Sequence, residues 1–160
     1  MKRQALALAL VLSIATPALA GPPWISIELP ANPYDRTSRG AFLLVHTFHH
    51  GNEIGATPSG TAEGVVGGQR RSVPLKFEQT TRTGVYALQN LWGGQGVWTL
   101  VIGMKQGDHP MDRAQALVEI AANGEVTRVR VPTVREREHL LPSPMALKEI
   151  EQELRVRAGR

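Results

Sequence analysis

The sequence Ala-Phe-Leu-Leu-Val-His-Thr-Phe-His, residues 41–49, predicts a central β-strand. Side chains of an extended chain point alternately to two faces. Phe42 and the even-numbered residues up to Phe48 would therefore share one face, and Leu43 and the odd-numbered residues up to His49 the other. Both faces are rather apolar, which is typical of a strand that is covered on both sides. The run indicates that the core lies between layers of extended chain.

The same alternation continues through most of the chain from Trp24 to Val131. Further strands are expected at residues 24–29, 61–66, 72–78, 85–91, 97–104, 114–121 and 126–131. Turn residues such as glycine and Asn-Gly separate these runs and favour reversals of the chain. Seven or eight short strands of this kind predict a mostly β protein, an immunoglobulin-like antiparallel β-sandwich, with a small barrel as the alternative.

Local features add detail to this prediction. Pro74 cannot donate a main-chain hydrogen bond, so its strand is expected at a sheet edge. Asn123-Gly124 predicts a type I′ hairpin turn, whose two central residues both need positive φ. Arg128 and Arg130 in the last strand are expected to face water, and the glycine-rich residues 64–68 indicate a turn.

Residues 1–20 have the three parts of a cleavable signal peptide. Lys2 and Arg3 give a positive start, residues 5–14 are almost wholly apolar, and the Ala-Leu-Ala ending offers the small residues that a signal peptidase requires. A membrane anchor is the alternative, but a spanning helix needs about 20 apolar residues and this run is shorter. We expect cleavage after Ala20 and a periplasmic or secreted protein that is not integral to the membrane.

The composition excludes several classes of function. The chain has no cysteine, which excludes a disulfide, a thiolate nucleophile and a cysteine-based zinc site. Its 18 basic residues stand against 14 acidic ones, and two of the basic residues lie in the leader, so residues 21–160 are nearly neutral. Nucleic-acid binding normally needs a basic stripe with aromatic residues among it, and the sequence has none. We therefore expect no nucleic-acid partner.

The chain changes character after Pro132. The run Arg-Glu-Arg-Glu at residues 135–138 indicates a mixed-charge linker, and a helical pattern follows it. We expect residues 1–20 to be the signal peptide, residues 21–132 a single β-sandwich domain, and residues 133–160 a charged linker with a C-terminal helix.

The C-terminal helix is predicted from its start signals and its apolar spacing. Ser143 is a typical N-cap, and Pro144 is typical of the first helical position. Leu147, Ile150 and Leu154 form a narrow apolar stripe. Such a helix either packs loosely on its own domain or docks on a partner, and a helix this short is marginal alone. We expect loose packing, and an envelope protein or component is the partner that this helix would bind.

No sequence motif for catalysis is evident. The sequence lacks the Gly-x-Ser-x-Gly elbow of hydrolases, a P-loop, and a Gly-x-Gly-x-x-Gly turn after a strand. Serine, histidine and aspartate occur, but no local pattern groups them. We expect a non-catalytic protein without a required cofactor.

Histidine and methionine form the one group of residues that suggests a ligand. Two histidines, His49 and His50, follow the strand at 41–49, and Met104, His109 and Met111 lie at and after the end of the strand at 97–104. If each connection reverses the chain, these two strands run the same way and their ends meet at one rim. Imidazole and thioether together suit copper, because thioethers are soft ligands that favour Cu(I). A surface pair of histidines and a core methionine are the alternative interpretation.

A recurring pattern lies between residues 70 and 131. The sequence Gly84-Val85-Tyr86-Ala87, a turn, and then Gly96-Val97-Trp98 followed by alternating aliphatic residues resembles exported YtkA-like and FixH-like domains. Carboxypeptidase-regulatory-like domains share the general pattern. The resemblance implies an immunoglobulin-like sandwich.

A second resemblance concerns copper. Residues 109–111, His-Pro-Met, are similar to the His-x-Met element of periplasmic copper chaperones, whose pattern also has an upstream histidine and methionine. Apart from Met1, no methionine precedes Met104 in this chain. We expect a non-catalytic, exported binding or accessory domain of the cell envelope, and the alternative is a periplasmic copper-binding protein.

Overall fold

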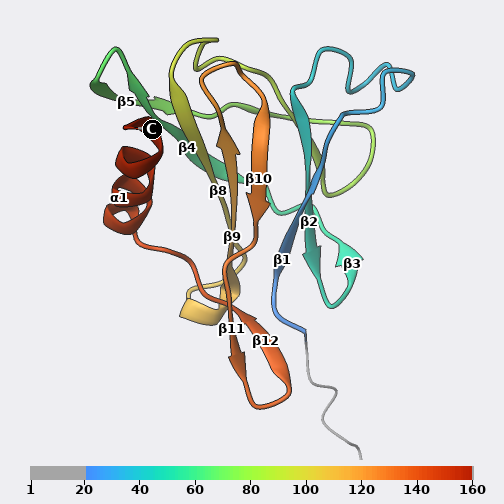
Figure 1. Cartoon of the computed structure of the whole chain (residues 1–160). Helices are drawn as coiled ribbons and strands as arrows, with labels where there is room; N and C mark the ends of the chain where they lie inside the picture. Colours follow the sequence, from blue (N-terminus) through green and yellow to red (C-terminus); the bar gives the residue numbers. More distant parts are fainter. Residues whose placement is uncertain (1–20, 160) are drawn as a thin grey trace, which may run out of the picture.

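The computed structural model describes residues 21–159, and the expected signal peptide lies outside the described residues. Two five-stranded antiparallel sheets pack face to face (Figure 1). Sheet A has the order β1-β2-β7-β6, with β3 paired to β2, and sheet B has the order β10-β9-β8-β4-β5. The fold is therefore a mostly β, antiparallel sandwich with one C-terminal helix, as the alternation predicts.

The strands of each sheet have the following bounds. Sheet A contains β1 (Trp24–Glu28), β2 (Leu43–His49), β3 (Asn52–Glu53), β6 (Phe77–Gln79) and β7 (Val85–Leu88). Sheet B contains β4 (Ser59–Val66), β5 (Gln69–Pro74), β8 (Val97–Lys105), β9 (Arg113–Ile120) and β10 (Val126–Arg130). A short helix η1 (Pro110–Asp112), a hairpin of β11 (Thr133–Glu136) and β12 (His139–Pro142), and the helix α1 (Leu147–Ala158) complete the elements.

The core lies between the two sheets. Its fully buried members from sheet A include Ile25, Leu43 and Val45, and those from sheet B include Leu100 and Ile102. These residues occupy every second position of their strands, so the residues that face the other sheet follow the period of two, whereas Leu44 between two of them is buried in a separate cluster. The strand around Pro74 is the edge strand β5 of sheet B, as expected.

The position of Trp98 explains why residue 64 is a glycine. A Cβ on Gly64 would lie 2.3 Å from Cε3 of Trp98, so the indole of β8 packs directly on the main chain of β4. The expected turn at residues 64–68 is therefore wrong in part: Gly64 is a strand residue, and Gly67 and Gly68, both with positive φ, form the β4–β5 turn.

The β9–β10 hairpin differs from the expected turn type. Gly124 has φ 85°, but among the described non-glycine residues only His50 and Arg137 have positive φ. Asn123 instead accepts a hydrogen bond from the main-chain N–H of Glu125 through its side-chain oxygen, at 3.1 Å. A register shift between Val126 and Arg128 follows. These features match a three-residue loop with a bulge rather than a type I′ turn.

The helix α1 lies on the outer face of sheet B (Figure 1), and its packing differs from the expected loose packing. Ile150 and Leu154 are each only 1% exposed. The outer face beneath includes the apolar Leu117, which is fully buried. The helix therefore covers a second, smaller apolar layer on the outer face of sheet B. Its narrow apolar stripe is sufficient for this packing because ion pairs on either side of the stripe also join the helix to the sheet.

The start of α1 also differs from the prediction. The helix begins at Leu147 after the N-cap Ala146, so Ser143 is not its N-cap and Pro144 is not its first residue. Gln115 in β9 holds this approach, since its side-chain amide both accepts from the N–H and donates to the carbonyl of Met145, at 2.9 and 3.3 Å. A tertiary hydrogen-bond pair thus moves the helix start beyond the residues with the best local signals.

Residues 133–142, expected as a linker, form the β11–β12 hairpin that projects from one end of the sandwich (Figure 1). Arg137 at its tip has φ 54°. Within residues 21–159, no helix has the length and apolarity needed to cross a membrane.

Candidate functional site

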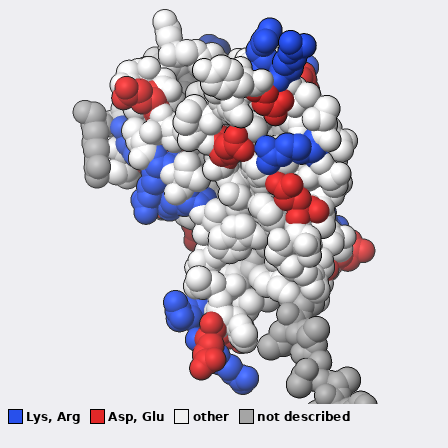
Figure 2. Space-filling model, turned by 90° about the vertical axis from the view of Figure 1, so that its right-hand side faces the viewer, with Lys and Arg blue, Asp and Glu red and all other residues white. Residues whose placement is uncertain are grey.

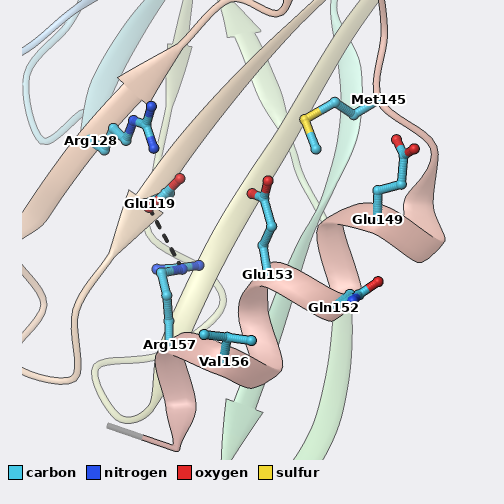
Figure 3. A pocket seen from close by; sticks show the side chains of 8 residues that line it. All are labelled: Glu119, Arg128, Met145, Glu149, Gln152, Glu153, Val156 and Arg157. Carbon is cyan, nitrogen blue, oxygen red and sulfur yellow. Dashed lines mark ion pairs between the residues drawn. The ribbon is translucent and has the colours of Figure 1, made fainter.

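A groove of about 670 Å³ lies between α1 and the strands β9 and β10 (Figure 3). Its lining residues come from the sheet, from the segment before the helix, and from the helix: Glu119, Arg128, Met145, Glu149, Gln152, Glu153, Val156 and Arg157. The groove exists because α1 lies on the outer face of sheet B and does not reach the free edge of β10.

One wall of the groove contains a buried charge cluster. The Glu119 side chain is 10% exposed, and its Oε1 lies 3.1 Å from Nη2 of Arg130, while Oε2 lies 3.7 Å from Nε of Arg157. Arg130 also pairs with Glu153 of the helix. The expectation that Arg130 faces water is therefore wrong, because its side chain pairs with Glu119 of the neighbouring strand and with Glu153 of the helix.

Arg157 joins the helix to the centre of sheet B. Its Nη2 donates to the main-chain oxygen of Trp98 at 3.1 Å and to the hydroxyl of Thr99. Burial lowers the pKa of the Arg157 guanidinium, and the charges of Glu119 and Glu153 oppose that shift. A guanidinium stays protonated in proteins, so this contact remains a charged one.

A second charge cluster fixes the other side of α1. Nη2 of Arg70 lies 3.0 Å from Oε2 of Glu63 and 2.7 Å from Oε1 of Glu151 in the helix. The hydroxyl of Ser72 donates to Glu63 Oε1 at 2.7 Å. Burial raises the pKa of the Glu63 carboxyl, but hydrogen bonds from Thr61, Ser72 and Arg70 outweigh burial and leave the pKa below 4.5. The helix is therefore held by ion pairs on both sides of its apolar stripe.

The chemistry of the groove is mixed. Val156 is 54% exposed and supplies apolar surface beside the carboxylates of Glu149 and Glu153. On the sheet side, the Arg128 side chain lies above Glu119 (Figure 3). The buried Nε atoms of Arg130 and Arg157 have no hydrogen-bond partner among residues 21–159. The groove thus combines one exposed apolar side chain with charged donors and acceptors.

The structure brings two of the predicted metal ligands together. The rings of His49 and His50 have centroids 3.9 Å apart, and Nδ1 of His49 lies 3.1 Å from Nε2 of Gln106 after β8. The ends of β2 and β8 therefore meet, as the strand directions predict. Among residues 21–159, no group of three or more His, Cys, Asp or Glu side chains is placed to hold a metal ion.

The other predicted ligands are placed differently. Met104 is 3% exposed and belongs to the core between the sheets. His109 is the N-cap of η1, where its Nδ1 accepts from the main-chain N–H of Met111 at 3.2 Å. Met111 is exposed. The core interpretation of Met104 thus fits the structure, because even-numbered residues of β8 point inward.

A further polar cluster lies on the outer face of sheet A. Nε2 of His46 lies 3.0 Å from Glu28 Oε2, and its Nδ1 lies 2.8 Å from Glu53 Oε1, with Arg82 within 4 Å of both carboxylates. The two ring nitrogens of His46 face two different carboxylates on opposite sides of the ring. His46, Glu28 and Glu53 therefore do not converge on one point. On the side of the molecule that carries β1, β2 and β3, basic and acidic side chains are interspersed (Figure 2).

Comparison with protein family models, with curated proteins and with solved structures found no match for this chain.

The buried glutamates Glu63 and Glu119 were not among the residues predicted from the sequence. A signal for them is present in β9, where Leu117 is apolar on the face opposite to the core residues Ala116 and Val118. An apolar residue on the outer face indicates that something covers that face. The C-terminal helix that covers this face was predicted, but the strand pattern does not indicate which sheet the helix covers.

Proposed function

We propose that this chain is a non-catalytic, exported binding or accessory domain of the cell envelope, and that an extended segment of an envelope protein binds in the groove beside α1. The observation that carries the proposal is that the groove reaches Arg128 of β10, a strand at the free edge of sheet B. The proposal of export rests on the signal-peptide pattern of residues 1–20.

An edge strand favours an extended ligand. A partner segment can add to β10 by main-chain hydrogen bonds, and alternate side chains of that segment then point toward the groove. Arg128 and Val129 on β10 are exposed, and Val156 on α1 offers an apolar surface opposite. The side chains of the segment that face the groove would meet Val156, the guanidinium of Arg128 and the carboxylate of Glu149.

The charge clusters support a binding role. They fix α1, so the groove has a defined shape before a ligand arrives, and a preformed site loses less entropy on binding. The carboxylates of Glu63 and Glu119 are both engaged by arginines, and His46 is engaged by two glutamates. These paired groups stabilise the fold. The groove beside α1 is therefore the part of this surface that we assign to ligand binding.

Photo-crosslinking in the native envelope tests the proposal. A benzophenone amino acid at Val156 should give one adduct of defined mass with an envelope protein, whereas the same probe at Tyr34, which is 92% exposed on a remote loop, should not. Arg128→Glu should reduce the Val156 adduct without changing the thermal unfolding of the domain. Equal adducts from both probe positions, or none, would contradict the groove as the binding site.

The alternative is a periplasmic copper-binding protein that uses a His/Met rim. The contact between His49 and His50, at the rim where β2 and β8 end, favours it. With Met104 in the core, Met111 is the remaining thioether for Cu(I). Native mass spectrometry with Cu(I) should show one bound ion in the wild type and loss of that ion in Met111→Leu. Equal binding by both proteins would contradict this alternative.

A further inference from the structure

The start of the mature chain lies against the β2–β3 turn. A Cβ built on Gly21 would be 3.7 Å from the Cα of His50, and Pro23 is buried. The β1–β2 register pairs Trp24 with Phe48, so residues before Trp24 continue toward the turn that follows His49 (Figure 1). Gly21 therefore lies beside the main chain of His50, the second residue of the histidine pair.

The turn itself has an unusual residue. His49 pairs with Asn52, and the two residues between them, His50 and Gly51, have φ 53° and 76°. This is the conformation of a two-residue type I′ loop, in which Asn-Gly is strongly preferred. A non-glycine residue in the left-handed region is uncommon, although histidine is one of the types enriched there, and such residues cluster at functional sites. The left-handed conformation of His50 brings its ring beside that of His49, although neighbouring residues of a strand normally point apart.

The orientation of His49 is supported from the other sheet. The side-chain amide of Gln106 lies 3.1 Å from Nδ1 of His49. The amide can present its oxygen instead of its nitrogen, and Nδ1–H then donates to it while Nε2 keeps a free lone pair. Histidines that bind metals commonly donate their second ring N–H to an oxygen acceptor in this way. Gln106 is therefore placed as a positioning residue for His49.

We propose that the α-amino group of Gly21 and the imidazoles of His49 and His50 form a binding site for Cu²⁺. The proposal rests on the proposed export, because removal of residues 1–20 creates this amino group. Residues 22 and 23 are prolines without an amide N–H, so the amide nitrogens beside the amine cannot become metal ligands. Further nitrogen ligands must come from elsewhere in the fold, and the two imidazoles lie at the same turn.

The ligand types select the metal. Amine and imidazole nitrogens without a thiolate suit Cu²⁺, which binds such sites more tightly than the other divalent first-row metals. The thioether of Met104 is in the core, so the site differs from a Cu(I) site of the His/Met type. This role accounts for two features. One is His50 at a turn position that prefers asparagine, and the other is the position of Gly21 beside it.

The test uses protein prepared with Gly21 as its first residue and Cu²⁺ alone as the probe. Competition with a chromophoric chelator measures affinity, and electron paramagnetic resonance counts the coordinating nitrogens. His50→Asn is the informative variant, because asparagine is preferred at this turn position and the fold is retained. It should weaken Cu²⁺ binding more than about tenfold and remove one nitrogen from the spectrum. Gln106→Leu should weaken binding about 10–100-fold with the nitrogen count unchanged.

The amino group has its own control. Acetylation of the α-amino group of Gly21 removes its free lone pair, and this protein should lose the same affinity as His50→Asn. His139→Asn, on the projecting β11–β12 hairpin, should bind as the wild type does. Equal affinity in the wild type, the acetylated protein and His50→Asn would overturn the site. The binding test uses protein that already begins at Gly21, so its result does not depend on export or cleavage in cells. A failure of export or cleavage would be detected separately, from the mass of the chain in the envelope fraction.

Discussion

Oε2 of Glu63 lies 3.0 Å from Nη2 of Arg70 across the β4–β5 hairpin, and the Glu63 side chain is only 2% exposed. A nearly buried carboxylate is stable only where its oxygens are hydrogen-bonded and its charge is balanced. Arg70 in turn contacts Glu151 of α1. One sheet-edge arginine thus links the inner strands of sheet B to the helix, so a change at Glu63 affects both.

Glu63→Gln should lower the free energy of unfolding by about 2 kcal/mol at pH 7, because charge-assisted hydrogen bonds from Arg70 and Ser72 are lost. The pKa of Glu63 is lowered in the folded protein, so its stabilisation is present above the unfolded pKa and is lost as pH falls through the folded pKa. The wild type should therefore lose this contribution below about pH 4.5, and the variant should not.

Urea unfolding at pH 7 and at lower pH values measures this difference. Glu78→Gln is the matched control, because Glu78 is an exposed glutamate on β6. The control should follow the wild type at each pH. An unfolding free energy for Glu63→Gln that stays parallel to the wild type down to acid pH would contradict the role given to Glu63.

Leu154→Ala should destabilise the whole domain by about 2–4 kcal/mol, since Leu154 on the buried face of α1 is 1% exposed and its truncation leaves a cavity. Leu147→Ala on the same helix should change stability by less than about 0.5 kcal/mol, because Leu147 is 48% exposed. Chemical unfolding followed by tryptophan fluorescence and by circular dichroism should give one shared transition. Separate melting of the helix, with the sheets unaffected by Leu154→Ala, would show that α1 does not stabilise the sandwich.

Gly64→Ala should destabilise the fold by about 1–3 kcal/mol, because the added methyl group would overlap the Trp98 indole. Gly55→Ala serves as the comparison, since a Cβ on Gly55 has no heavy atom within 4 Å and the position has no positive φ. Thermal unfolding and the emission wavelength of tryptophan report the two variants. A shifted emission is expected for Gly64→Ala alone, and unchanged emission and stability there would mean that Trp98 does not pack on β4 in solution.

Export should produce a chain that begins at Gly21. A signal peptidase requires small residues before the cleavage point, so Ala18→Gln combined with Ala20→Gln should leave residues 1–20 attached. Intact-mass measurement of protein from the envelope fraction separates the two forms by the mass of the leader. A wild-type chain that keeps its leader, or that remains in the cytoplasm, would remove the basis of the proposed localisation.

The strand pattern and the positions of most turns followed from the sequence because both depend on neighbouring residues, although the type of the turn at Asn123-Gly124 did not. The alternation of residues 41–49 predicts β2, Pro74 predicts an edge strand, and the glycines at residues 93–96 indicate the connection before β8. Even the proximity of His49 to the end of β8 could be predicted, since strand directions reverse at each turn. These statements need only the geometry of an extended chain and its reversals.

The helix and its groove depended on contacts between distant residues. Ser143 and Pro144 carry better helix-start signals than Ala146, yet the hydrogen bonds of Gln115 to Met145 place the start later. Glu119 and Arg130 have the polarity of surface residues, and they are covered only because α1 lies on sheet B. Local propensities are too weak to decide such placements against tertiary hydrogen bonds and buried charge pairs. The sequence by itself therefore determined the sandwich and the positions of most of its turns. The tertiary structure alone decided which sheet face the helix covers, where the groove lies and that Gly21 lies beside His50.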